Sequence, residues 1–374
     1  MTLLAATAIS VQVSAQEQQK QPSSAPSAIL TKFNVPHAGT GSYQGTAPLS
    51  INGAGTITGY YQDAKNVFHG FVRAANGTIT TFDVPGAGKG SYQGTVPENI
   101  NNEGAITGYY YAPDFTGHGF LRSADGTITK FDVPGAYGTY SENINDSGTI
   151  SGTYEDGRYF YHGFVRRADG TFTTFDAPGA YDTYVYENSM NAEGAITGSE
   201  YDGYGTHGFL RSPDGSMLTT FDIYGALLTY PLGLPTNDGE TVVGYSWDDS
   251  YVYHGFLRAP DGAITQLDDP HAGTAPGQGT EAYAVNSTGW IVGGYGDVNN
   301  KYHGFARSRG GVYTTIDAPG ASGGTYPVAI NPAGVIAGYF YDKNNAYHGF
   351  VWTPIGPHGS IVELEDFSDS GTPQ

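Results

Sequence analysis

The chain contains no cysteine and few basic residues, and both shortages limit what it can be. With no Cys among its 374 residues, disulfides, zinc–thiolate sites and thiol catalysis are excluded. Lys and Arg number 16 against 36 Asp and Glu, which gives a formal net charge of −20. Because nucleic acids and anionic membranes are bound through clustered Lys and Arg, we expect neither as a partner. Stability must therefore come from the packing of a large core.

Charged residues make up only 14% of the chain, whereas 56 Gly and 30 Tyr are present. Abundant Gly together with Tyr and Thr disfavours long helices and favours short strands joined by tight turns. The aromatic share of 14% is far above that of disordered segments. The composition predicts a folded, all-β protein.

Long apolar runs are missing except at the N-terminus. An apolar stretch from Leu3 to Val13 leads into a Val-Ser-Ala triplet, a small-x-small pattern suited to signal peptidase, although no Lys or Arg precedes it. We interpret residues 1–28 as a signal peptide and polar linker, 29–367 as one domain and 368–374 as a tail. This interpretation predicts a secreted protein, extracellular or periplasmic. No other apolar run approaches the ~20 residues of a membrane span.

Internal repeats determine the expected architecture. The tripeptide His-Gly-Phe occurs seven times between His69 and His348, with a mean spacing of 46.5 residues. Each copy lies in one pattern: an apolar run ending in Asn, a turn ending in Gly, I-x-G-Y, HGF-x-R, an Asp-Gly turn, and T-x-T-x-F-D-x-P-G-A. A period of about 40 to 50 residues is typical of a propeller or a solenoid.

Four strands are expected in each repeat. In the second repeat they end at Ile100 and cover Ala105 to Tyr111, His118 to Arg122 and Thr127 to Val133, linked by turns that suit hairpins. A four-stranded meander repeated seven times predicts a seven-bladed β-propeller of antiparallel blades. A β-solenoid is the alternative, although its coils are usually shorter.

The first repeat offers a means of closing the ring. A segment like the fourth strand, Leu30 to Val35, precedes any other strand, and we expect it to complete the last blade, whose other strands lie within Tyr326 to Trp352. The segment Ser360 to Phe367 also resembles a fourth strand and competes for this place. We favour closure by the N-terminal strand because it runs into the first repeat as the other fourth strands run into theirs.

The repeated G-x-I-x-G-Y, HGF and F-D segments resemble the extracellular HAF-repeat family of bacterial proteins, named for a His-Ala-Phe triplet that is His-Gly-Phe here. The resemblance covers nearly everything from residue 29 to 367. It implies a secreted repeat protein and no settled activity. The sequence has no S-x-D-x-G-x-T-W box of sialidases, no W-D or Y-W-T-D repeat and no D-x-D-x-D-G calcium loop.

The His of each HGF triplet is expected to be structural. Neighbouring copies around a seven-fold ring would lie ~14 Å apart, estimated from strand spacing, whereas ligands of one metal lie within ~4 Å of each other. We expect each His to hydrogen-bond backbone or a neighbouring Asp, with the F-D Asp as a blade-locking acceptor. A recurrent Asp between the second and third strands is expected to set an Asx turn. The F-D residues are Asp83, Asp132, Asp176, Asp222, Asp268 and Asp317.

Function is expected where the repeats differ, and they differ mainly in the crossover from the fourth strand to the first strand of the next repeat. Counted from the Ala of P-G-A to the Asn ending the first strand, it is 14 residues long before repeats 1, 2 and 6 and 9 to 11 elsewhere. In a meander propeller these crossovers emerge on the same face as the loops between second and third strands. That face, at the mouth of the channel, is the predicted site.

The long crossovers supply most of the candidate residues. Two matched S-Y-Q-G-T segments suggest sugar contacts, with tyrosine rings beneath the sugar and amides on its hydroxyls; Trp247 lies in a loop expected on the same face. Two crossover histidines replace the Gly of P-G-A and are candidate catalytic residues. The predicted ligand contacts are Tyr43, Gln44, Tyr92, Gln93 and Trp247, and the histidines are His37 and His271.

Strand-borne carboxylates form a second candidate group. Glu98, Glu142 and Glu187 occur in the first strands of three consecutive repeats, with Glu281 in another. Close to a propeller axis such side chains could form a calcium site or a general acid–base pair. Strand alternation counts against this, because Glu98 shares a strand face with the core residue Ile100.

The sequence leaves three functions open. The first is a secreted, monomeric propeller that binds a carbohydrate or another small neutral ligand at the channel mouth. The second is a glycoside hydrolase or lyase that uses the His, Tyr and Glu residues there. The third is a protein-interaction scaffold. No motif demands catalysis, a cofactor or a metal, and the sequence leaves calcium at the channel open.

Overall fold

The computed structural model describes residues 27–234 and 240–355, and their only regular structure is β-strand. No helix in this part of the chain could cross a membrane. Strand pairing forms seven antiparallel groups of four strands, one for each sequence repeat, which we call units 1 to 7.

Units 1 to 4 follow each other along the chain. Unit 1 is β2 (Gly45–Ile51), β3 (Ile57–Gln62), β4 (Phe68–Arg73) and β5 (Ile79–Phe82); unit 2 is β6 (Gly94–Ile100), β7 (Ile106–Tyr111), β8 (Gly117–Arg122) and β9 (Ile128–Phe131). Unit 3 is β10 (Gly138–Ile144), β11 (Ile150–Glu155), β12 (Tyr161–Arg166) and β13 (Phe172–Phe175); unit 4 is β14 (Asp182–Met190), β15 (Ile196–Tyr201), β16 (Thr206–Arg211) and β17 (Leu218–Phe221).

Units 5 to 7 complete the set, and unit 7 includes the first strand of the chain. Unit 5 is β18 (Leu228–Gly233), β19 (Val242–Trp247), β20 (Tyr253–Arg258) and β21 (Ile264–Leu267); unit 6 is β22 (Gly279–Val285), β23 (Ile291–Gly296), β24 (Tyr302–Arg307) and β25 (Tyr313–Ile316). Unit 7 is β26 (Thr325–Ile330), β27 (Ile336–Tyr341), β28 (Tyr347–Ile355) and β1 (Ser27–Phe33).

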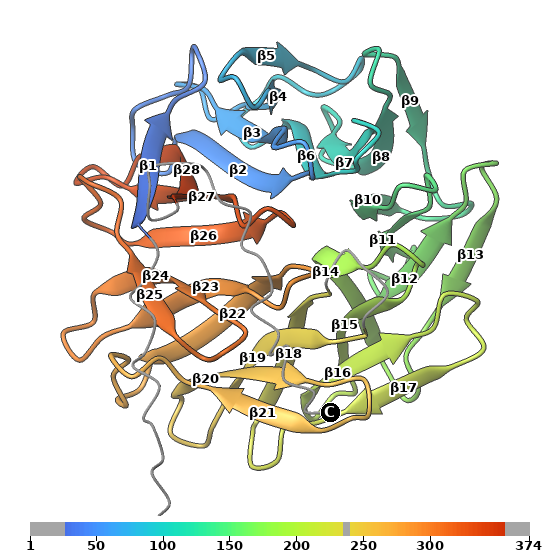
Figure 1. The fold of residues 1–374 in the computed structure, drawn as a ribbon. Coiled ribbons are helices and arrows are strands. Elements are labelled where there is room, and N and C mark those ends of the chain that lie inside the picture. The colour runs from blue at the N-terminus through green and yellow to red at the C-terminus, as the bar shows by residue number, and fades with distance from the viewer. Residues whose placement is uncertain (1–26, 235–239, 356–374) are drawn as a thin grey trace, which may run out of the picture.

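The units surround a common axis, with the first strand of each nearest to it (Figure 1). The core lies between neighbouring units rather than within one. Phe71 of unit 1, for example, belongs to a buried cluster that also holds Ala337 and Val351 of unit 7. All seven Phe of the HGF triplets are almost completely buried, which explains why this residue recurs. They are Phe71, Phe120, Phe164, Phe209, Phe256, Phe305 and Phe350.

The N-terminal strand pairs with the last strand of the chain. β1 runs antiparallel to β28, with Leu30 opposite Trp352. The strand begins at Ser27 and ends at Phe33, so it starts inside the segment assigned to the linker and is offset from the predicted Leu30 to Val35. The competing segment 360–367 lies outside the described residues, as does the segment predicted as signal peptide and linker except for its last two residues.

Hydrogen bonding between strands does not run continuously around the axis. Within the described residues it gives two sheets of 12 strands and one of four, so strand pairing by itself does not show the closed ring of blades that the sequence predicts. The joins between units are parallel bridges, and three of the four arise from the long crossovers. These three pair Gly45 with Tyr347, Gly94 with Phe68 and Gly279 with Tyr253.

Candidate functional site

A cavity of about 610 Å³ lies on the predicted face, between units 1, 2 and 4. Two loop residues line it, Tyr92 from a long crossover and Phe115 from the loop between β7 and β8. Deeper residues come from the strands, and they include the carboxylates Glu98 and Glu187. The aromatic side chains that line the cavity are Tyr60, Phe68, Tyr92, Tyr109, Tyr111 and Phe115.

Three of the predicted glutamates meet beside this cavity. One carboxylate oxygen each from Glu98, Glu142 and Glu187 lies within 4.8 Å of the other two. Glu98 is buried, with 7% of its surface exposed, Glu142 is half-buried and Glu187 is exposed. The group is therefore enclosed on the side of unit 2 and open to solvent on the side of unit 4.

A β-bulge explains why strand alternation gave the wrong orientation for these residues. In β6 the register shifts between Pro97 and Asn99, so Glu98 is the extra residue that has no partner on β7. β10 shifts in the same way around Glu142. Because a bulge resets the alternation of side chains, Glu98 leaves the core face of Ile100 and points toward the other two carboxylates.

The third glutamate is placed by a larger irregularity in β14. Val185 pairs with Gly198 and Met190 with Ile196, so four residues of β14 lie opposite a single residue of β15. The inserted segment reaches units 2 and 3: Asn99 Nδ2 donates to Asn188 Oδ1 at 3.3 Å, and Asn143 Nδ2 donates to Tyr186 O at 2.8 Å. The sequence count assigned these extra residues to the crossover, but they lie inside the strand.

The pKa values of all three carboxyl groups are raised. Burial, together with the neighbouring carboxylates, raises the pKa of Glu98 well above its ordinary value. Desolvation and the charge of Glu187 raise the pKa of Glu142 to about 8, and loss of hydration beside the other carboxylates raises the pKa of Glu187 as well, although part of that side chain is exposed. Among the described residues, no hydrogen bond donor or cationic side chain pairs with the Glu98 carboxylate. A proton or a bound cation must balance the group.

Glu281, the fourth glutamate, is held separately in unit 6. Its carboxylate accepts hydrogen bonds from the hydroxyls of Tyr283, at 2.8 Å, and Tyr302. Burial raises its pKa, while these two hydrogen bonds oppose the shift. It does not belong to the group of three.

The two predicted tyrosine platforms occupy equivalent positions and differ in what they contact. Tyr43 and Tyr92 are 57% and 56% exposed, and both have a positive φ, 59° and 63°. Tyr92 lines the cavity. Tyr43 instead contacts Tyr341 edge-on, with ring centres 6.4 Å apart. Only one member of the predicted pair therefore lies at the cavity.

The two predicted amides are engaged within the protein. Gln93 accepts from Gly90 N at 2.9 Å and donates to Pro113 O at 2.8 Å. Gln44 likewise accepts from Gly41 N and donates to Asn66 Oδ1. Each amide thus links its long crossover to a neighbouring loop, an internal role that the sequence did not suggest.

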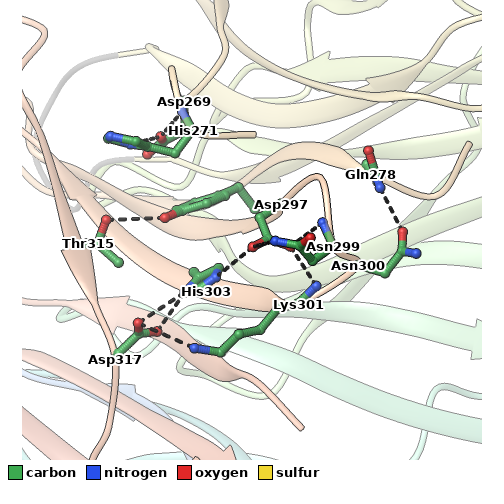
Figure 2. A network of polar contacts seen from close by, with 11 residues as sticks. Asp269, His271, Gln278, Asp297, Asn299, Asn300, Lys301, His303, Thr315 and Asp317 are labelled. Carbon is green, nitrogen blue, oxygen red and sulfur yellow. Dashed lines mark hydrogen bonds and ion pairs between the residues drawn. The ribbon is translucent and has the colours of Figure 1, made fainter. Parts of the chain in front are cut away.

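The remaining candidates do not line the cavity. His37 is exposed, with a φ of 72° where the other P-G-A segments mostly have Gly. His271 places Nδ1 2.9 Å from an oxygen of Asp269 (Figure 2). Trp247 is half-buried and packs edge-on against Tyr253, with ring centres 5.2 Å apart.

The HGF histidines have the structural contacts that were expected. In unit 6, His303 Nδ1 lies 2.9 Å from Asp317, and Nε2 lies 3.6 Å from the loop residue Asp297 (Figure 2). The same loop carboxylate accepts from Asn299 N and Lys301 N, which is the predicted Asx turn. In unit 7, Asn34 replaces the F-D Asp and contacts His348 Nδ1 at 3.0 Å.

Tyr60 and Phe115 are among the cavity residues that were not identified from the sequence. Tyr60 was hidden because it belongs to the repeated I-x-G-Y pattern. Phe115 was hidden in a loop of constant length. At the equivalent position units 1, 6 and 7 have Asn, whereas units 3 and 5 have Tyr. Phe115 adopts a φ of 67° there, a conformation that Asn tolerates far better than Phe.

Known structures resemble this arrangement, at low sequence identity. A catalytically inactive histidine-to-alanine variant of virginiamycin B lyase from Staphylococcus aureus, solved with quinupristin, has a TM-score of 0.58 and 13% identity over 87% of this chain and 99% of that chain. The β-propeller domain of the trilobed protease from Pyrococcus furiosus, described with an open velcro topology, has a TM-score of 0.60 and 10% identity over 88% and 97%. A streptogramin B lyase has a TM-score of 0.55 and 14% identity over 86% and 97%.

At these identities the likeness shows the fold alone, and the chain is a β-propeller. No protein-family model matches it, and no curated protein matches its sequence. The similarity to HAF-repeat proteins therefore remains a resemblance between motifs.

Proposed function

We propose that the chain forms a closed propeller of seven four-stranded blades, with β1 as the fourth strand of the last blade. Two contacts between units 7 and 1 support closure. Asn331 Nδ2 donates to Asn52 O at 3.2 Å, continuing a series of Asn bonds that also links units 1, 2 and 3. The guanidinium of Arg73 lies over the ring of Phe33, as equivalent Arg residues do between other units.

We further propose that the propeller is a secreted monomer that binds a carbohydrate at the channel mouth. The aromatic cavity is the observation that carries the binding proposal. Tyrosine rings offer apolar faces for the C–H side of a sugar and hydroxyls for its polar edge, and carboxylates are good acceptors for sugar hydroxyls. Secretion rests on the N-terminal apolar stretch.

A glycan array on the purified protein, followed by calorimetry with the best ligand, tests this function. Tyr92→Ala is expected to weaken binding by ~1 to 2 kcal/mol, which is about 5- to 30-fold in Kd. Tyr137→Ala is the matched control, because Tyr137 is an exposed crossover residue of unit 3 that does not line the cavity. Equal losses in the two variants, or no glycan bound at all, would contradict the proposal.

A glycoside hydrolase or lyase is the second candidate, favoured by the three carboxylates. Their oxygens lie within 4.8 Å of each other, close to the ~5 to 5.5 Å that separates the two carboxyl groups of retaining glycosidases. The pKa of about 8 for Glu142 would keep this residue protonated as a general acid near neutral pH. A reducing-end assay tests this: Glu142→Gln should abolish turnover in an enzyme, whereas a binding protein shows no turnover to lose.

An interaction scaffold, the third function left open, would show neither glycan binding nor turnover in these assays. Its distinguishing result would be a protein partner whose binding is insensitive to Tyr92→Ala.

A further inference from the structure

The glutamate group and the adjoining cavity together define a site of unbalanced negative charge. Glu98 is more than nine-tenths buried and lines the cavity, and no hydrogen bond or ion pair reaches its carboxylate among the described residues. Glu142 and Glu187 bring two further carboxylates to the same point. Three like charges at this separation repel each other strongly unless protons or a cation neutralise them.

The geometry and the chemistry of the donors narrow the choice of cation. The 4.8 Å limit on oxygen separation is twice a Ca²⁺–oxygen bond of about 2.4 Å, so the three oxygens fit on the coordination sphere of one ion. All three donors are hard carboxylate oxygens, which favours Ca²⁺, Mg²⁺ or Mn²⁺ over zinc or copper. Irregular, partly solvated coordination suits Ca²⁺ better than Mg²⁺, which demands a near-ideal octahedron.

The cavity supplies the access that an ion requires. Glu187 is exposed and lines the cavity together with Glu98, so an ion and its remaining water ligands can enter from the channel mouth. Bulges in β6 and β10 and the insertion in β14 all turn glutamates toward one point. The corresponding bulge residues of units 1 and 7 are Leu49 and Val328, which offer no oxygen ligand.

We propose that Glu98, Glu142 and Glu187 bind one calcium ion at the inner end of the aromatic cavity. The proposal does not depend on a carbohydrate ligand, and it can hold or fail whichever ligand the cavity takes.

Calorimetry on EDTA-treated, dialysed protein tests the site, with CaCl₂ as titrant and MgCl₂ in a parallel arm. The expected result is one Ca²⁺ per chain, bound at least tenfold more tightly than Mg²⁺, with a higher melting temperature in CaCl₂. Glu142→Gln and Glu187→Gln should each weaken binding at least tenfold. Glu281→Gln is the matched control, because this carboxylate lies outside the group and has its own tyrosine partners; it should bind Ca²⁺ as the unchanged protein does.

Terbium provides a second measurement that does not rely on stability. Tb³⁺ in the site should show emission sensitised by the tyrosines of the cavity, and Ca²⁺ should quench it by competition. Circular dichroism confirms that the variants are folded. The proposal is overturned if the unchanged protein binds no Ca²⁺, if Mg²⁺ binds equally well, or if folded Glu142→Gln and Glu187→Gln retain full Ca²⁺ binding and Tb³⁺ emission.

Discussion

The guanidinium carbon of Arg73 lies 4.9 Å from the centre of the Phe33 ring, which joins the third strand of unit 1 to the N-terminal strand of the chain. The same relationship recurs between neighbouring units farther along, as with Arg211 and Phe175 at 4.9 Å and Arg258 and Phe221 at 5.1 Å. β1 therefore makes the contact that a fourth strand makes elsewhere in the molecule.

Removing the Phe33 ring should destabilise the protein as much as removing an equivalent ring between two internal units. Phe33→Ala loses a half-buried aromatic group and a cation–π contact, for an expected ~2 to 3 kcal/mol from partial cavity and cation–π costs. Phe221→Ala is the matched control, and urea denaturation measures both. If Phe33→Ala left the free energy of unfolding unchanged while Phe221→Ala lowered it, β1 would not hold the ring together.

The His–Asp pairs should make stability depend on pH. The hydrogen bond that the His69 imidazole donates to the Asp83 carboxylate raises the pKa of His69, which means that the folded state favours the imidazolium. A raised His pKa contributes stability that is fully present below the unfolded pKa of ~6.5 and is lost as pH rises through the folded pKa. Asp83→Asn should remove this contribution. The free energy of unfolding of the variant should therefore lie farther below that of the unchanged protein at pH 5 than at pH 8. A deficit that is constant with pH would exclude a protonated His69.

His162→Ala should cost stability and leave ligand binding unchanged. The imidazole Nδ1 lies 2.6 Å from Asp176 and the ring stacks on Tyr154. Loss of the hydrogen bond and the stacking contact should lower the free energy of unfolding by ~1 to 3 kcal/mol. Loss of glycan binding by a variant that remains folded would assign this histidine a functional role instead.

The glutamate group should also make stability fall with rising pH in the absence of metal. The folded-state pKa of Glu142, about 8, lies above its ordinary value, so the folded state holds more protons than the unfolded state between about pH 4.5 and 8. Stability therefore decreases as pH rises across that range. Glu142→Gln should flatten this part of the curve in EDTA, as measured by melting temperature. If the slope persisted in the variant, another group would be responsible.

The repeat pattern was sufficient to predict the strands and the structural role of the HGF histidines. In unit 2 the predicted second strand, Ala105 to Tyr111, differs from β7 by one residue at its start. This accuracy has a physical cause, because Gly turns and alternating apolar residues are local signals that recur seven times. Each HGF histidine was expected to bond backbone or a neighbouring Asp, and that neighbour is the F-D aspartate, 14 residues farther along the chain in five repeats and 15 in one.

The site was harder to predict because it depends on departures from regular geometry. Alternation in a strand assumes two residues per pleat, and the bulge at Glu98 breaks that assumption without a marker in the sequence. The insertion in β14 was counted as loop, since interval counts do not distinguish a longer crossover from a longer strand. The acceptors of the Gln44 and Gln93 amide groups, Asn66 and the carbonyl of Pro113, lie on other loops, so their internal role was not evident from the sequence.

Phe115 offers a final test, because it sets stability against function at one position. A φ of 67° is strained for Phe and is tolerated by Asn, which occupies the equivalent place as Asn66 and Asn345 at 63° and 58°. Phe115 is also 57% exposed, so replacing it loses little packing. Phe115→Asn should therefore stabilise the fold by ~0.5 to 1 kcal/mol through relief of strain while weakening glycan binding several-fold.

The reverse change in unit 7, Asn345→Phe, should destabilise the protein by a similar amount and leave binding unchanged. Urea denaturation and calorimetry measure the two effects. If Phe115→Asn bound glycan as well as the unchanged protein, the strained aromatic would have no part in the site, and the cavity's contribution to binding would have to come from Tyr60, Tyr92 and Tyr109.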